Sequence, residues 1–169
     1  MGYSIDIVNK HTKRTVSISD SCFNDIDISS FDDYGSTICI DGTDRLSTNI
    51  TYNYAPFFKK AFGEKGIRSI YGISFGEAVH KLQYAEQIFS SADKTDTEWV
   101  IKYEEPTEEE KMSFERIFQC KWEQPSGYWE CTVDNCLKAV RHLLFLSEIM
   151  EKLVTASGLS IDDYEWYGD

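Results

Sequence analysis

The chain has 169 residues, of which 41% are hydrophobic and 14% aromatic, and its formal net charge at pH 7 is −12. This length and composition fit one domain with a hydrophobic core, and they exclude wholesale disorder. The apolar runs are far shorter than the roughly 20 residues that span a bilayer, and no basic region followed by an apolar core opens the sequence, so we expect a cytoplasmic protein.

Alternating apolar and polar residues in the first third of the chain predict a small antiparallel sheet. We expect an opening hairpin of residues 2–8 and 14–19, a third strand at Ser36–Ile40 and a fourth at Leu46–Tyr52. Asp41-Gly42 is a tight-turn signal between the last two strands.

Helical periodicity dominates the rest of the chain. Apolar residues three and four positions apart predict helices at about residues 55–62, 74–90 and 133–155. Thr107 and Glu110 form a capping-box pattern that begins a further helix running through Lys121.

Two short segments have more than one interpretation. Trp99–Tyr103 fits either a strand or an extended connector. The acidic and aromatic tail at residues 161–169 either docks on the body of the protein or stays free.

Together these elements predict an α+β fold, with a small N-terminal antiparallel sheet packed on a C-terminal helical bundle. We expect a single domain over residues 1–169. Its β-rich part covers residues 1–54, and its helical part covers residues 55–160 with an acidic insertion at 91–125.

The acidic charge is concentrated in the C-terminal half. Residues 1–95 hold 10 basic and 12 acidic residues, whereas residues 96–169 hold 7 and 17. Direct binding to nucleic-acid phosphates needs clustered basic residues, and because the sequence has no such cluster, we expect no direct binding to nucleic acid. An acidic face suits a basic protein partner, and the alternative is that the charge only keeps the protein in solution.

The cysteines form no recognised metal or disulfide pattern. They are an odd number without a C-x-x-C pair, and Cys131 and Cys136 are five positions apart. That spacing matches no common zinc site, so we expect reduced thiols, no metal and no cofactor. The five cysteines are Cys22, Cys39, Cys120, Cys131 and Cys136.

The sequence also lacks the common catalytic motifs, so we expect a protein that is not an enzyme and has no catalytic residues. His80 lies at the margin of an apolar stripe, and His142 is expected on the polar side of the last helix. A small enzyme with an unrecognised site near Tyr52, Tyr54, Arg68 and His80 stays open as an alternative.

The run NITYNYAPFFKKAFGEKGIRSIYG at residues 49–72 gathers aromatic residues and glycines at a strand-to-helix junction. With SFGEAVHKLQYA, GYWECTVDNCLKAVRHLLFL and the final WYGD, it resembles a family of small proteins of unknown function from bacterial genomes and mobile elements. The resemblance implies a shared scaffold, and because the family has no known activity, it assigns no catalytic residues to this chain. The block is either a junction that completes the core or a binding surface of Asn49, Tyr52, Asn53, Tyr54, Arg68 and Tyr71.

Relative to that family, this chain adds the acidic segment from about Ser91 to Pro125. Many small proteins encoded on mobile elements inhibit host defence enzymes by binding them, and this analogy predicts a non-enzymatic inhibitor of a basic nucleic-acid-handling protein, such as a CRISPR effector. A structural protein that acts by self-association is a further alternative. The expected partner-binding residues are Trp99, Tyr103, Glu104, Glu105, Glu108, Glu109, Glu110, Trp122, Tyr128 and Trp129.

Overall fold

The structure is a computed structural model. It describes residues 2–13, 36–40, 46–51, 54–93, 96, 99–102, 106–122, 130–156 and 158–168. The strand expected at residues 14–19 and the turn expected at Asp41-Gly42 lie outside these ranges.

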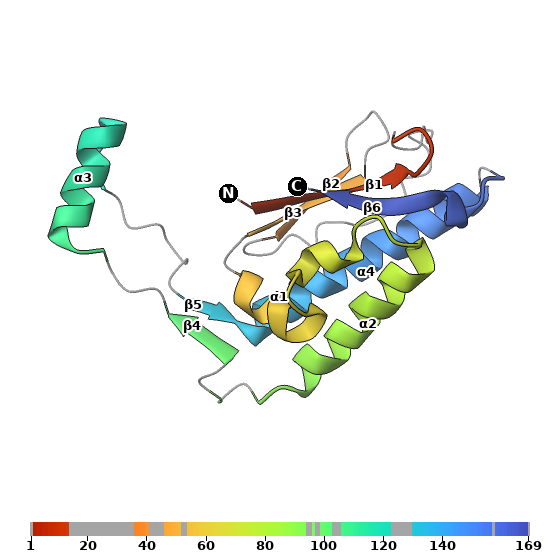
Figure 1. The fold of residues 1–169 in the computed structure, drawn as a ribbon, viewed down its shortest axis with the longest axis horizontal. Helices are drawn as coiled ribbons and strands as arrows, with labels where there is room; N and C mark the ends of the chain where they lie inside the picture. The colour runs from red at the N-terminus through yellow and green to blue at the C-terminus, as the bar shows by residue number, and fades with distance from the viewer. Residues whose placement is uncertain are drawn as a thin grey trace.

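The secondary structure confirms an α+β fold in which strands and helices segregate into layers (Figure 1). The elements in chain order are β1 (Gly2–Asn9), β2 (Ser36–Ile40), β3 (Leu46–Thr51), α1 (Ala55–Phe62), the 3-10 helix η4 (Gly66–Ile70), α2 (Phe75–Ser91), β4 (Val100–Lys102), α3 (Glu108–Phe118), β5 (Glu130–Thr132), α4 (Val133–Ala156), the 3-10 helix η6 (Ile161–Asp163) and β6 (Tyr164–Gly168).

The main sheet of the described residues has the strand order β2-β3-β1-β6, and every neighbouring pair is antiparallel. Strand β1 is an inner strand. Tyr3 lies opposite Ile50 of β3, and Ile7 lies opposite Trp166 of β6. The aromatic tail therefore docks on the body as a strand. Separately, β4 and β5 form a short antiparallel pair.

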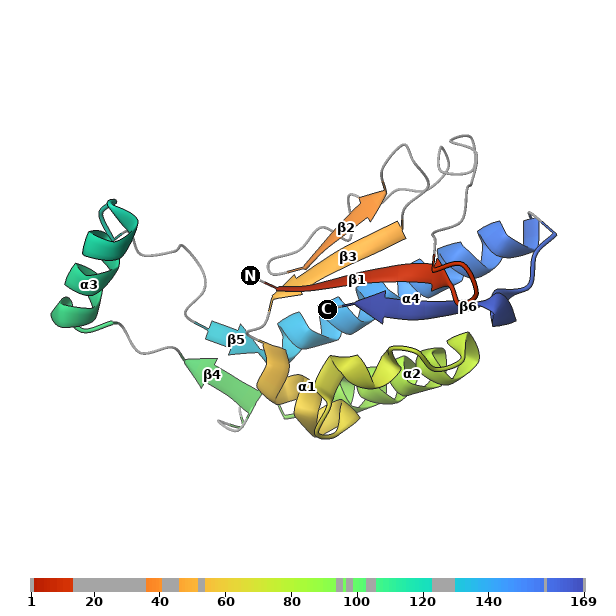
Figure 2. The same ribbon diagram turned by 45° about the horizontal axis from the view of Figure 1, so that its top comes forward.

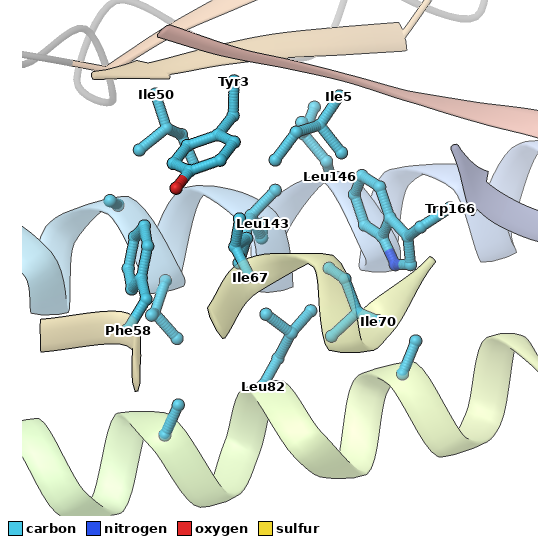
Figure 3. Packing of buried hydrophobic residues seen from close by; sticks show 14 of the residues in the cluster. Tyr3, Ile5, Ile50, Phe58, Ile67, Ile70, Leu82, Leu143, Leu146 and Trp166 are labelled. Atoms are coloured by element: carbon cyan, nitrogen blue, oxygen red, sulfur yellow. The ribbon is translucent and has the colours of Figure 1, made fainter. Parts of the chain in front are cut away.

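The helices cover one face of this sheet. In both views α4 runs along the sheet, and α2 packs against α4 on the side away from it (Figures 1 and 2). Figure 3 shows Tyr3, Ile5 and Ile50 extending from the sheet toward η4 and α4, with Leu82 of α2 below them. Since α4 is packed on both sides, His142 is only 3% exposed, which corrects the expectation that it lies on a polar face.

Local sequence signals explain where the helices begin and end. Helix α1 has Pro56 in its first turn and ends at Gly63, whose φ of 89° favours glycine. Helix α2 begins after Ser74, whose Oγ accepts a hydrogen bond from the Glu77 N–H at 3.2 Å. The boundaries of α1, α2 and α4 confirm the predicted helices to within a residue or two, whereas α3 ends at Phe118, three residues before the predicted end at Lys121.

Helix α3 differs from the others because it lies apart from the sheet and from α1, α2 and α4. Both ribbon views place it at one end of the molecule, beyond the β4–β5 pair (Figures 1 and 2). None of its residues is buried. Among the described helices, none is long and apolar enough to cross a membrane.

Candidate functional site: an exposed amphipathic helix

We call residues 106–122 the α3 arm. Its N-terminal end is fixed by the predicted capping box, in which the Thr107 Oγ1 accepts from the Glu110 N–H at 3.3 Å. In return the Thr107 N–H donates to Glu110 Oε2 at 2.9 Å. Glu108 pairs with Lys111 at 3.2 Å. Two of the three consecutive glutamates thus have local partners, and all three lie at the positive end of the helix dipole.

The C-terminal end of the arm is closed by a turn at Gln119, whose φ is 54°. The Gln119 side-chain amide donates to the Arg116 carbonyl at 2.8 Å, and the Trp122 N–H donates to Glu115 Oε1 at 2.8 Å. These hydrogen bonds fold the chain back, so that Trp122 lies edge-on to Phe114 with ring centroids 5.0 Å apart.

The arm exposes large apolar side chains. Met112, Ile117 and Phe118 are 68%, 66% and 61% exposed. Phe114, Ile117 and Phe118 are spaced i, i+3, i+4, which places them on one side of the helix, and we call them the apolar row. The rings of Phe114 and Phe118 lie 4.6 Å apart. Burying a side chain of this size is worth about 1.5–3 kcal/mol, so the row favours association with another apolar surface.

The structure groups only some of the predicted partner-binding residues on this arm. Glu108, Glu109 and Glu110 are exposed at its start, and Trp122 lies half-buried at its end. The predicted residues Tyr103, Glu104, Glu105, Tyr128 and Trp129 lie outside the described part of the chain.

Trp99 packs with the body. Its indole stacks on Phe57 at a centroid distance of 6.3 Å and an interplanar angle of 8°. It meets Phe89 edge-on at 6.1 Å, and Lys60 Nζ lies 4.4 Å from its ring centroid. Its aromatic contacts therefore join α1 to α2, and they do not extend the surface of the arm.

Met112 and the apolar row were not among the predicted binding residues. Their helical spacing is visible in the sequence, but that spacing normally indicates a face turned toward the core. The helix was predicted, and what could not be predicted is that Ile117 and Phe118 on its apolar side are left exposed.

The block at residues 49–72 mainly makes packing contacts. Tyr54 is 2% exposed and meets Phe58 edge-on at 5.9 Å, and the Arg68 guanidinium lies over the Tyr3 ring at 5.5 Å. Gly66 and Gly72 have positive φ angles of 54° and 67°, as expected for glycines at tight turns. This arrangement supports the structural interpretation of the block.

Tyr71 and Asn49 belong to the same junction. A Cβ on Gly168 would lie 2.7 Å from the Tyr71 hydroxyl, and one on Gly2 would lie 2.5 Å from Asn49 Oδ1. Both ends of the chain thus pack closely against this block. Tyr52 and Asn53 lie outside the described residues.

A shallow groove of about 360 Å³ lies between α1 and α2, and Ala61, Phe62, His80, Lys81 and Tyr84 line it. His80 is the only member of the alternative enzymatic cluster among these lining residues. Tyr54 is in the core, so the described members of that cluster do not converge on this groove.

The described residues hold no group of three His, Cys, Asp or Glu side chains arranged to hold a metal ion. Cys120 is an exposed free thiol, and Cys136 is a buried one.

No protein-family model, curated protein or solved structure matches this chain.

Proposed function

We propose that this chain is a non-enzymatic protein-binding module whose α3 arm seats its apolar row in a groove of a basic partner protein. One observation carries the proposal. Helix α3 is capped at its start, lies apart from the body and exposes Ile117 and Phe118 by about two-thirds.

The spacing of the apolar row supports a helix-in-groove interaction. Such helices present anchors at i, i+3, i+4 and i+7 to an apolar groove. Phe114, Ile117 and Phe118 supply three such anchors. The capping box supports the helix before binding, which reduces the entropy lost when a partner orders it.

Charge supports a basic partner. Residues 96–130 hold 10 acidic and 4 basic residues, and the exposed Glu108, Glu109 and Glu110 add negative charge beside the apolar row. Charges at the rim of an interface mainly raise the association rate, and salt screens them. A nucleic-acid-handling protein has the required basic groove. The further proposals that this partner is a defence enzyme, and that this chain inhibits it, rest on the analogy with mobile-element inhibitors.

The test is binding of purified nucleic-acid-handling proteins to the immobilised full chain. The arm variant is Ile117→Asp with Phe118→Asp. Loss of each buried anchor weakens binding by at least about tenfold, because each 1.4 kcal/mol is a factor of ten. This variant loses two anchors, so binding should weaken by at least about 100-fold. Tyr167→Asn is the matched control, since Tyr167 is an exposed aromatic residue on β6 and a neutral side chain adds no charge opposite Asp6. Equal binding by the arm variant and the wild type would overturn the proposal.

Charge is tested separately with Glu109→Lys. We expect a slower association rate with little change in dissociation, and a smaller dependence of the association rate on salt. If the wild-type affinity is the same at low and high salt, the partner is not recognised through its charge.

A further inference from the structure

We propose that, without a foreign partner, the α3 arm of one copy docks in the α1–α2 groove of a second copy. The proposal uses the same helix as the proposed function but does not require a foreign partner to exist. It rests on the match between the arm and the groove, which lie on different parts of one chain.

The groove offers apolar contact with a basic rim. Phe62 is half-buried and Tyr84 is 60% exposed, so both rings are accessible from its open side. Lys81 and His80 also line it. An aromatic surface next to a lysine suits a partner that brings apolar side chains and carboxylates together.

The segment that forms the groove is basic within an acidic chain. Residues 55–91 hold five basic and three acidic residues, whereas the whole chain has a net charge of −12. The acidic residues are Glu64, Glu77 and Glu86, and Glu86 lies 3.4 Å from Arg141 of α4. An acidic helix is therefore attracted more strongly to this segment than to the average surface of the protein.

The arm supplies the complementary chemistry. Its apolar row fits the Phe62–Tyr84 side of the groove, and Glu108, Glu109 and Glu110 supply carboxylates for Lys81. The arm and the groove are different surfaces, so a single arm-to-groove contact between two copies is heterologous. When each copy places its arm in the groove of the other, the two contacts form a closed dimer. The second contact is then intramolecular, which raises the stability of the dimer above that of a single contact.

The mass of the full chain in solution, measured over a concentration series, tests this inference. We expect a reversible dimer. The arm variant carries Ile117→Asp with Phe118→Asp, and the groove variant carries Tyr84→Asp. Each should weaken dimerisation by at least about tenfold, while Tyr167→Asn leaves it unchanged. Because all these side chains are exposed, thermal unfolding of each variant should match that of the wild type.

Mixing the two variants is the decisive experiment. The arm variant keeps an intact groove, and the groove variant keeps an intact arm, so the mixture should form a heterodimer held by one contact. In the same way, Lys81→Glu should weaken dimerisation and Glu109→Lys should restore it. A chain that is monomeric at every concentration, a groove variant that dimerises like the wild type, or a mixture without heterodimers would each overturn the proposal.

The two proposals fail in different ways. If only self-docking is wrong, the groove variant and the wild type behave alike in mass measurements, and a foreign partner still loses affinity for the arm variant. If only the proposed function is wrong, no foreign protein distinguishes the arm variant from the wild type, and the mixing experiment still yields heterodimers.

Discussion

Replacing Trp166 with alanine tests whether the C-terminal strand is part of the core. Trp166 is 0% exposed and lies opposite Ile7 in the sheet. Its indole stacks on Phe75 at the start of α2, with ring centroids 6.5 Å apart and an interplanar angle of 7°. Its carbonyl accepts a hydrogen bond from the Gly72 N–H at 3.1 Å. One residue thus connects the tail, the sheet and a helix, and its side chain supplies the contact with the helix.

The size of the effect follows from this burial. A buried aromatic side chain removes about 150–250 Å² from water, which at about 25 cal/mol per Å² corresponds to roughly 4–6 kcal/mol. Measured Trp→Ala substitutions cost about 3–5 kcal/mol. Since domains are stable by about 5–15 kcal/mol, Trp166→Ala should remove a large part of the free energy of unfolding. At about 2–4 °C per kcal/mol for a chain of this size, Tm should fall by roughly 6–20 °C.

The assay is guanidinium unfolding followed by far-UV circular dichroism, with Tyr167→Ala as control. Tyr167 is the next residue on β6 and is 57% exposed, so its loss should cost less than about 1 kcal/mol. Trp166→Phe should fall between the two, because it keeps a ring on Phe75. It also removes an indole N–H that is buried without a hydrogen-bond partner among the described residues. A Trp166→Ala variant as stable as Tyr167→Ala would refute the assignment of the tail to the core.

Three further predictions concern two glycines and the arm. Gly168→Ala should destabilise the protein by about 1–3 kcal/mol in the same unfolding assay, because its Cβ would lie 2.7 Å from the Ser4 carbonyl oxygen. Gly76→Ala should instead be neutral or stabilising by up to about 1 kcal/mol, since its Cβ meets nothing within 4 Å in the first turn of α2. Thr107→Ala should remove about 1 kcal/mol of capping and reduce hydrogen-exchange protection in α3 alone, while Tm of the body is unchanged. A fall in Tm for Thr107→Ala would show that α3 packs on the body.

Local patterns in the sequence predicted most of the elements. The apolar spacing of α2 and α4, the capping residue Thr107 and the alternation in β1 all act over a few residues. The pairing of β1 with β6 could not be found in this way, because its two strands lie at opposite ends of the chain and the tail is short. Likewise β4 and β5 have three residues each, too few for a period to be recognised.

The candidate site was only partly predictable for a related reason. Helices α2 and α3 show similar apolar spacing, yet α2 buries Leu82 and Phe89 and α3 buries no residue. A helical period indicates that an apolar side exists, but the surface that covers this side is set by tertiary contacts. The acidic composition directed attention to the segment that contains α3, and the exposed apolar side chains on it could be recognised only in the structure.

The geometry of the arm shows that some of its acidic residues have structural roles. Glu110 closes the capping box and Glu108 pairs with Lys111, so both have a role in the isolated chain. Their presence would be explained even if no partner existed. Ile117 has no such explanation, because an exposed Ser or Lys would suit a solvated helix equally well. Phe118 contacts Phe114, but it still leaves 61% of its surface exposed. The proposed recognition therefore depends on the apolar row, and we expect charge to set how fast and under which salt conditions a partner binds.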